Sequence, residues 1–283
     1  MSRTQALSIY ASDSVKAELK NKIAGVFENL AKDTISGRLK SKNGALNEKA
    51  GSFEFKRFAN ATVQEYGTAR AAGAGNKIKA LPVIINLDRN REIVEEVNTF
   101  DAGSFTDEDL NAFLARRKTA IQQSVARDLD RDFFNAAKTG GTAKAALDDT
   151  KELVPQLEAI IAELEVTNNE YVDGVDREQM ALVLNTTYYG KVKTELNDCY
   201  NFSGTVADEV FKGINGVATF SSNRLPAGVA YVLMVMDSIA QPVMITDIKI
   251  EPIPFSNESA VEVFYRNKSQ VIAQELVLYG NEA

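Results

Sequence analysis

Residues 106–138 carry the longest uninterrupted helical pattern in the chain, and this stretch most restricts the folds that the chain can adopt. It contains neither proline nor glycine, and its apolar residues recur mostly three, four or seven positions apart. A helix of this length is roughly 50 Å long, which exceeds the diameter of a small domain. The apolar stripe consists of Leu110, Phe113, Leu114, Ile121, Val125, Leu129 and Phe133. We therefore predict one long helix that carries a second layer along a single narrow face.

Both ends of the predicted helix have ordinary boundary signals. Thr106 is suited to cap the first turn, and the acidic residues 107–109 lie where the helix dipole is positive. Lys138 falls in the last turn, and we expect Gly140 or Gly141 to end the helix in the left-handed conformation. The charged residues lie mostly off the stripe, so we expect them to face solvent or neighbouring molecules.

The composition argues against an enzyme. The 283 residues include no histidine and a single cysteine, Cys199, which removes the usual general base and the commonest metal ligand. The best acidic pairs are Asp148/Asp149 and Glu95/Glu96, but neighbouring carboxylates do not face one another and such pairs are usually solvated. We predict no catalytic, cofactor-binding or metal site, and no cofactor.

Two further classes of partner are disfavoured. The small-residue segment 73–76 (GAGN) lacks the Lys-Ser/Thr ending of a P-loop and does not lie between a strand and a helix, so nucleotide binding is not expected. The longest apolar stretch, 229–236, has the length of a strand and is too short to span a bilayer. We therefore predict no membrane partner.

Charge is distributed unevenly along the chain. Residues 1–60 hold 11 Lys and Arg against 6 Asp and Glu, a balance of +5 in a chain of net charge −7, so the remaining residues carry −12. A helix is predicted from Ser12 or Asp13 to Lys32, followed by a polar segment over 33–52. Such a module favours a clamp on something negative, either nucleic acid or a neighbouring subunit. The alternative is that these lysines only form a solvated face.

A long ribbon is predicted next. Residues 53–58 (FEFKRF) form one strand and residues 77–87 return as the other, with Pro82 at its start or edge. The tip, 69–76, is rich in Ala and Gly. Because an isolated two-stranded hairpin is marginally stable in water, we infer that this ribbon lies on another molecule.

The second half of the chain mixes helices and strands. We predict a linker over 142–149, and the strand and helix patterns show no internal repeat, so the class is α+β. Helices are expected over 153–164 and from Thr186 or Thr187 to Leu196, and residues 197–209, which include Cys199, are expected to form a loop. Strands are expected at 180–184, 229–236, 243–250, 260–265 and 270–279, with a hairpin about Asn215-Gly216 within 211–220.

The order of these parts resembles the major capsid proteins of tailed bacteriophages, whose Hong Kong-type fold is shared with encapsulins. The resemblance covers about residues 53–280 and lies in the order of elements, because the family has no short diagnostic motif. It implies an N-terminal arm (1–52), an extended loop or E-loop (53–87), a P-domain with a long spine helix (88–141), an A-domain (142–253) and closing P-domain strands (254–283).

The resemblance also implies a function. We expect a structural protein of the virion that self-assembles, in the host cytoplasm, into hexamers and pentamers of an icosahedral shell around double-stranded DNA. A separate scaffolding protein and a portal are expected partners, and DNA would be bound without sequence preference. Arg116, Arg117 and Lys118 could face this DNA or an acidic neighbour. The alternative is an encapsulin-like nanocompartment with a protein cargo. Some relatives crosslink a loop lysine to an asparagine; for Lys77, Lys79 and Asn267 we favour ordinary solubilising lysines.

Overall fold

The computed structural model describes residues 34–47, 51–61, 65, 79–97, 107–199, 213–252 and 259–282. The predicted N-terminal helix, the tip of the ribbon and Thr106 lie outside these residues. The chain is α+β, as predicted, and divides into two compact units. Unit 1 comprises residues 1–38, 87–130 and 241–268, and unit 2 comprises residues 39–86, 131–240 and 269–283.

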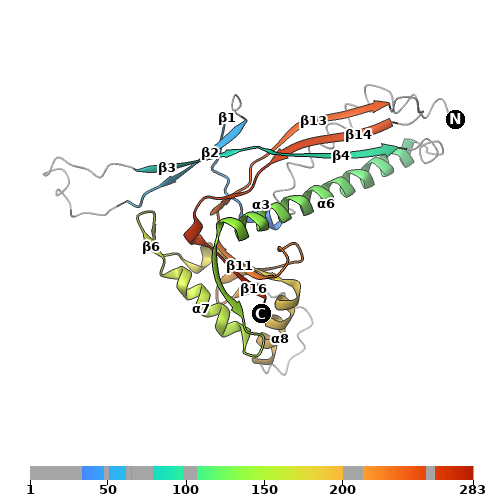
Figure 1. Ribbon diagram of the computed structural model, residues 1–283. Coiled ribbons are helices and arrows are strands. Elements are labelled where there is room, and N and C mark those ends of the chain that lie inside the picture. Colours follow the sequence, from blue (N-terminus) through green and yellow to red (C-terminus); the bar gives the residue numbers. More distant parts are fainter. Residues whose placement is uncertain are drawn as a thin grey trace. The chain divides into compact units, whose positions relative to one another are not determined.

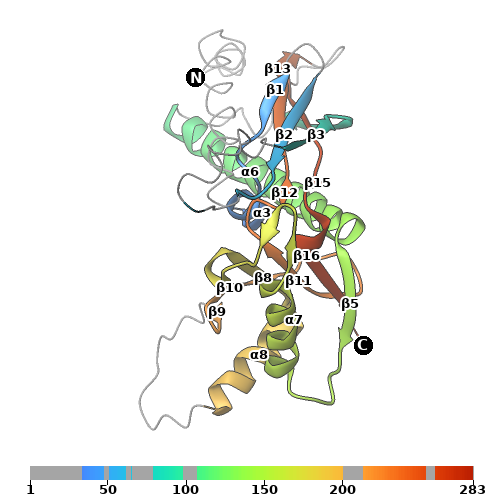
Figure 2. The same cartoon turned by 90° about the vertical axis from the view of Figure 1, so that its left-hand side faces the viewer.

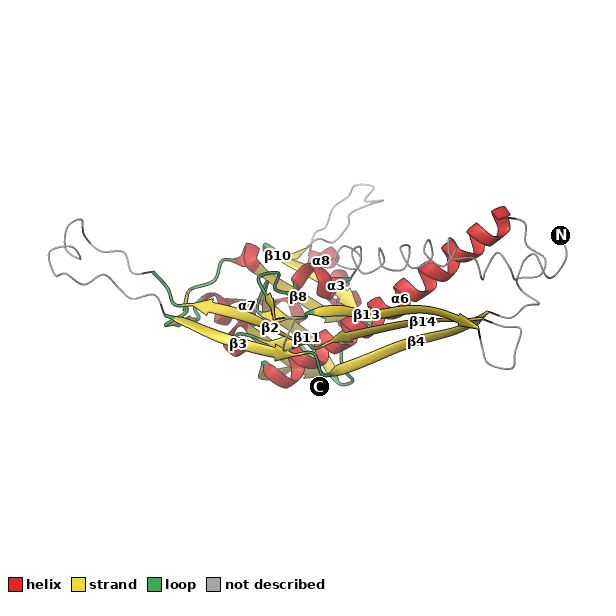
Figure 3. Cartoon of the chain, turned by 90° about the horizontal axis from the view of Figure 1, so that it is seen from above, coloured by secondary structure: helices red, strands yellow, loops and turns green. Residues whose placement is uncertain are grey.

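Unit 1 contains a three-stranded antiparallel sheet and most of the long helix. The sheet has the order β13-β14-β4, with β13 at Val243–Pro252, β14 at Ser259–Asn267 and β4 at Arg89–Val97. Figure 3 shows these three strands side by side. The short helix α3, Ile35–Leu39, begins in the same unit. The predicted strands 243–250 and 260–265 are therefore confirmed, each with a few more residues.

The long helix α6 runs from Asp107 to Gly140, which confirms the prediction from the apolar stripe (Figure 1). The stripe residues whose side chains are described, from Ile121 to Phe133, are all buried. The expectation that the charged residues face outward was wrong for Asp130, which is fully buried and accepts a hydrogen bond from the Ser36 N–H at 3.0 Å. The side chains of residues 107–118 lie outside the described set.

A polar cluster of unit 1 also contacts α6. Asp128 accepts two hydrogen bonds from the Arg89 guanidinium, at 2.7 and 2.9 Å, and one from the Tyr265 hydroxyl at 2.9 Å. Burial and the adjacent carboxylate raise the pKa of Tyr265 above its usual value, so the hydroxyl keeps its proton and donates. The charged residues of the helix thus bind its own sheet, which the apolar pattern alone does not reveal.

The end of α6 differs from the expectation. The helix ends at Gly140, but neither Gly140 nor Gly141 is among the residues with positive φ. Glycine is required at these positions for a different reason, which is space. A Cβ on Gly141 would lie 2.5 Å from the Ala137 carbonyl oxygen and 2.9 Å from that of Val277. A Cβ on Gly140 would lie 3.0 Å from two side-chain atoms of Val271. The two glycines therefore allow close packing.

Unit 2 is built on a six-stranded mixed sheet with the order β5-β16-β11-β8-β10-β9. Its strands are β5 (Thr142–Leu147), β8 (Met180–Asn185), β9 (Gly213–Ile214), β10 (Val217–Ser222), β11 (Val229–Val235) and β16 (Val277–Glu282). The two central strands, β8 and β11, pair antiparallel and are buried along nearly their whole length. This confirms the predicted strands at 180–184 and 229–236.

Two helices pack against this sheet. Helix α7 (Leu153–Glu165) and helix α8 (Thr186–Cys199) share one apolar cluster with the sheet, and Figure 2 shows them next to one another. Pro155 lies in the first turn of α7, where its missing N–H leaves no bond unmade. The start of α8 differs slightly from the prediction, because Asn185, rather than either threonine, accepts the Thr187 N–H at 3.2 Å.

The remaining elements of unit 2 are short. A three-stranded sheet has the order β1-β2-β3, from Ala45–Asn47, Ser52–Phe58 and Ala80–Asn86. A small hairpin pairs β6 (Asn168–Asn169) with β7 (Val172–Asp173). A separate two-stranded antiparallel sheet pairs β12 (Ile239–Ala240) with β15 (Gln270–Val271). Two 3₁₀ turns are η1 (Arg177–Gln179) and η2 (Gln274–Leu276).

Three local predictions in unit 2 were wrong, and one is confirmed. Residues 142–147 form the edge strand β5 and not a linker, the stretch 270–279 is broken by η2, and Cys199 ends α8 rather than lying in a loop. The hairpin at Asn215-Gly216 is confirmed. Both residues have positive φ, 46° and 90°, as a two-residue hairpin turn of type I′ requires. None of the helices in the described ranges has the length and apolar character needed to cross a membrane.

Candidate functional site

The ribbon formed by β2 and β3 has one face that packs on its own unit. Strand pairing places Phe53 opposite Ile85 and Phe55 opposite Val83, and this inner face is mostly covered. Phe55 and Ile85 are buried in a small cluster with Ala240 and with the partly buried Ile272. The alternation of FEFKRF thus predicts the burial correctly, because successive side chains of a strand point to opposite faces.

The other face of the ribbon is apolar and open. We define the outer strip as the residues that the register places on the face opposite Phe55, namely Phe58, Ala80, Pro82 and Ile84. Phe58 is 56% exposed and Ile84 is 62% exposed. One weak ion pair, Lys56 to Glu54 at 3.6 Å, accompanies the strip on the same face. Apolar side chains exposed along one strand face make the strip a candidate interaction surface.

An arginine on the inner face of the ribbon contacts two other segments of unit 2. Arg57 of β2 pairs with Glu275 of η2, and its guanidinium lies 4.7 Å from the centre of the Tyr171 ring. Asn169 also donates to the Glu275 carboxylate, at 2.9 Å. Partial burial favours a higher pKa for Glu275, but the hydrogen bonds from Arg57 and Asn169 outweigh it and lower the pKa.

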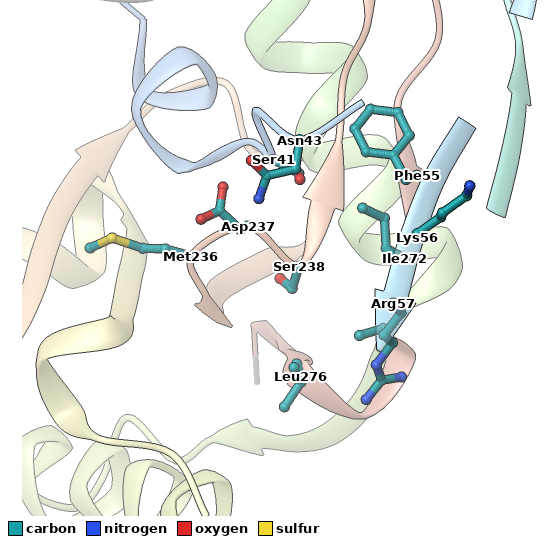
Figure 4. Close-up of a pocket in the computed structure, with 11 residues that line it drawn as sticks. Ser41, Asn43, Phe55, Lys56, Arg57, Met236, Asp237, Ser238, Ile272 and Leu276 are labelled. Atoms are coloured by element: carbon teal, nitrogen blue, oxygen red, sulfur yellow. The ribbon is translucent and has the colours of Figure 1, made fainter. Parts of the chain in front are cut away.

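The pocket in this region does not suit a small-molecule ligand (Figure 4). Its volume is about 180 Å³, below the range of typical ligand pockets. Of its charged lining residues, Lys56 and Arg57 pair with carboxylates outside the pocket. The hydroxyl oxygen of Ser238, although it has no partner among the described residues, is sealed from solvent and out of a ligand's reach.

The two members of the pair Asp148/Asp149 have separate partners. Asp148 accepts from the Thr150 hydroxyl and N–H and pairs with Lys151, and these contacts lower its pKa to about 2. Asp149 instead pairs with Lys191 at 2.8 Å. Glu95 and Glu96 are consecutive residues of β4, and the side chain of Glu96 is not described. Among the described residues, no group of three or more His, Cys, Asp or Glu has the arrangement of a metal site.

The crosslinking residues also have other contacts. The ammonium group of Lys79 lies 2.6 Å from the Glu170 carboxylate, which raises the pKa of Lys79. Asn267 is fully buried, and its side-chain oxygen accepts from Arg89 at 3.2 Å. Lys77 lies outside the described residues.

A comparison of the sequence with family profiles decides the class. The profile described as "Phage capsid protein" matches residues 102–262, which is more than half of the chain. This chain belongs to the phage capsid protein family. The capsid protein therefore has a structural role in a virion, and the matched region includes both α6 and the six-stranded sheet except for β16. No curated protein matches its sequence.

Solved structures agree on the fold of this capsid protein. The capsid of the cyanophage P-SCSP1u matches with a TM-score of 0.61 and 14% identity, over 88% of each chain. The capsid of a native GTA particle matches at 0.58 and 15%, over 90% of each chain. The virus-like particle from Pyrococcus furiosus matches at 0.55 and 10%, over 94% of this chain and 98% of the other. The phage capsid fold expected from the order of elements is thus confirmed, and the nanocompartment alternative is less well supported.

Sequence reasoning missed the contacts at the base of the ribbon. It identified the ribbon and its tip but assigned no role to Arg57, Tyr171 or Glu275. One signal was available: in FEFKRF the arginine occupies the same strand face as Phe53 and Phe55. A charged residue on the covered face of a strand requires a partner, because an unpaired buried charge is costly. The position of that partner, more than 200 residues away, was not predictable.

Proposed function

We propose that this capsid protein builds the closed icosahedral head shell of a tailed phage around double-stranded DNA. The outer strip of the ribbon is the observation that supports this proposal. Its apolar side chains are not covered by the chain's own described residues, and a second copy of the chain would bury them. In a shell, each ribbon contacts a neighbour through a heterologous contact that closes by rotation into hexamers and pentamers.

Many weak contacts are sufficient for such a shell. Burying Phe58 and Ile84 removes roughly 100–200 Å² of apolar surface from water, worth about 2–5 kcal/mol per contact. That contact alone is too weak to hold two chains together after the cost of association. Repeated over every subunit of a closed particle it becomes decisive, because the later contacts form within an assembly that already exists.

Several finer assignments are part of the same proposal. The five-part division into arm (1–52), E-loop (53–87), spine region (88–141), A-domain (142–253) and closing strands (254–283) is the working scheme. The basic arm acts as a clamp on an acidic neighbour, and packaged DNA is bound without sequence preference. Assembly in the host cytoplasm uses a separate scaffolding protein and a portal.

The main experiment removes the outer strip. We expect the double variant Phe58→Ser, Ile84→Ser to fold but to need at least tenfold more protein for particles to form. Sedimentation and negative-stain microscopy over a concentration series measure this threshold. Val166→Ser is the matched control, because Val166 is 75% exposed but does not lie on the ribbon. Unchanged assembly of the double variant would contradict the proposed role of the strip.

Two smaller experiments test the other parts. Deletion of residues 1–50 is expected to impair assembly, and normal assembly of the deletion variant would show that the arm is not a clamp. Nuclease-protected DNA extracted from particles made during infection separates a phage head from a nanocompartment, which would contain protein cargo instead.

A further inference from the structure

Strand β3 of the ribbon has a hydrogen-bonded neighbour on one side. In the sheet order β1-β2-β3 it is an outer strand, and among the described strands it pairs with β2 alone (Figure 3). Its seven residues, ALPVIIN, carry no charged side chain. An uncharged apolar edge strand is a template for the addition of another strand, because its outer backbone groups have no partner in the sheet.

One hydrogen bond at the end of the ribbon shows which backbone groups of β3 face its free edge. The Ala59 N–H donates to the Lys79 carbonyl at 2.9 Å, and these two residues continue the register of the ribbon. The backbone groups of successive residues in an antiparallel strand point alternately toward the partner strand and away from it. Since those of Lys79 point toward β2, those of residues 80, 82, 84 and 86 point to the free edge.

Pro82 occupies one of these outward positions. It is the third of the seven residues of β3, so it lies within the strand and interrupts the row of outward N–H groups. A proline has no N–H to donate, and within a sheet it is confined to positions where none is needed. Its register partner is Lys56, in a pair that exchanges no backbone hydrogen bonds. The β2–β3 ladder therefore loses nothing, whereas a strand added at the free edge would lack a donor.

The other edge strands in the described part of the chain are protected in different ways. Strands β1 and β9 and the four strands of the two-stranded sheets have two or three residues each. Five of the nine residues of β4 are charged, and the pairings of β5 and β13 each include a register shift. Short length, charge and bulges all disfavour strand addition, as proline does. Of these devices β3, with its regular register, has the proline.

We propose that Pro82 closes the free edge of β3 to strand addition, so that a second copy of the chain contacts the ribbon through the outer strip instead. This inference rests on the proposed function and specifies how the contact between copies is made. Pro82 takes part in both surfaces, because its side chain belongs to the outer strip and its backbone faces the free edge. It therefore determines which of the two surfaces a neighbour uses.

The competing product is a pair of ribbons joined edge to edge. The strand best suited to add to the free edge of β3 is the same edge of a second copy, since both are apolar and uncharged. Such a contact is isologous and closes at two chains, whereas a shell requires heterologous contacts that continue around a ring. Chains joined in this pair are withdrawn from shell assembly, so closing the edge favours particles.

The experiment restores the missing donor with Pro82→Val in the full chain. Valine favours strands and supplies an N–H at the free edge. In dilute chain below the particle threshold, we expect dimers at concentrations about tenfold or more below those that the parent needs, because each copy gains a hydrogen bond. Sedimentation velocity measures the dimerisation, and negative-stain microscopy should show particles only at a raised threshold.

Ala80→Val is the matched control. Residue 80 lies in the same outer strip and at the same edge, but it already has an N–H, so the variant adds the side chain without adding a donor. We expect it to change dimerisation by no more than about twofold, as is usual for an exposed substitution. If Ala80→Val dimerised as tightly as Pro82→Val, apolar surface rather than the backbone edge would be responsible, and the proposal would be overturned.

Hydrogen exchange identifies the edge directly. In the Pro82→Val dimer, exchange at the outward Ile84 N–H should be about tenfold or more slower than in the same variant diluted to monomer. Dimerisation equal to that of the parent, unchanged exchange at Ile84 in the dimer, or a folded variant that neither dimerises nor forms particles would each overturn the proposal. If Pro82→Val does not fold, Pro82→Thr replaces it, with the same expected changes and the same overturning outcomes.

A triple variant separates this proposal from the proposed function. Phe58→Ser, Ile84→Ser, Pro82→Val lacks the large side chains of the outer strip but has an open edge, so it should still dimerise. Absence of dimers in the folded triple variant would mean that the contact uses the strip, and would overturn the role of Pro82. Normal particle assembly by Phe58→Ser, Ile84→Ser would instead contradict the role of the strip and leave the comparison of Pro82→Val with Ala80→Val interpretable.

Discussion

The two larger sheets of unit 2 each contain a strongly apolar strand, but the surroundings of these two strands differ. Strand β11 (VAYVLMV) of the six-stranded sheet is buried at every position. Strand β3 (ALPVIIN) of the ribbon is almost as apolar, yet only Ile85 is buried and Ile84 beside it is 62% exposed. Apolar content therefore does not decide burial. What decides it is whether the same chain supplies a covering layer.

The covering layer of the six-stranded sheet can be identified. Four residues at helical spacing along α7, namely Leu153, Leu157, Ile161 and Leu164, are buried in the cluster that contains the even-numbered residues of β8. Among the described residues, the ribbon receives cover on its inner face, from residues such as Ala240 and Ile272. An apolar strand face that its own chain does not cover is available to another copy, and this contrast gives the predictions that follow.

The largest effect is expected in the six-stranded sheet. Leu233→Ala, at a fully buried position of β11, should lower the free energy of unfolding by about 2–5 kcal/mol, because it leaves a cavity among packed side chains. Urea denaturation of dilute, unassembled chain measures this loss. A loss below about 1 kcal/mol would mean that the sheet repacks easily, and the contrast with the ribbon would be weaker than the burial indicates.

The next effect separates the two faces of one strand. Ile85→Ala should lower the unfolding free energy by about 2 kcal/mol, near the low end for such truncations because its cluster is small. Ile84→Ala should change that free energy by no more than about 0.5 kcal/mol, since the side chain is mostly in water. The two isoleucines are adjacent, so composition and strand position are matched.

The same two variants should affect assembly in the opposite order to their effects on the unfolding free energy, after their difference in stability is taken into account. At a temperature where both variants are folded, Ile84→Ala should raise the concentration needed for particles more than Ile85→Ala does. If Ile84→Ala destabilised the isolated chain as much as its neighbour, the outer strip would already be covered within one molecule.

Sequence patterns predicted the helices and strands that have a strong apolar periodicity and whose apolar side is covered by nearby residues. The stripe from Ile121 to Phe133 identified α6, and positive φ at Asn215 and Gly216 matched the expected turn. The pattern failed where tertiary pairing overrides propensity. Residues 142–147 are rich in alanine, a poor strand former, but they extend parallel to β16 as the edge strand of the sheet.

The assembly surface was only partly predictable. The ribbon was predicted from FEFKRF, and the inference that it lies on a second molecule rests on the marginal stability of isolated hairpins. Its division into an inner and an outer face required the register that sets Phe55 opposite Val83 and Phe58 opposite Ala80. The partners of Arg57 arise from chain segments beyond residue 168, and a single sequence carries no signal for such distant pairs.

The smallest effect concerns the electrostatic attachment of the covering layer. Hydrogen bonds from Arg177 lower the pKa of Glu158 and of Glu165, both on α7. Arg177 also donates to the Asn215 carbonyl at 3.3 Å, and Asn215 donates to Glu158 at 2.8 Å, so the group joins α7 to the β9–β10 turn. A carboxylate whose pKa is lowered by folding stabilises the fold above its unfolded pKa, and this stabilisation is lost as the pH falls through the folded value.

We therefore expect the melting temperature of dilute chain to fall on acidification from pH 5.5 to pH 3, and to fall less in Arg177→Met. The difference between the two falls in melting temperature should be at most about 4 °C, because these side chains are partly exposed and such ion pairs contribute little. The two falls should converge in high salt, which screens the pairs. Identical falls at low salt would mean that α7 is held by apolar packing alone, and would make the contrast between covered sheet and open ribbon purely one of buried surface.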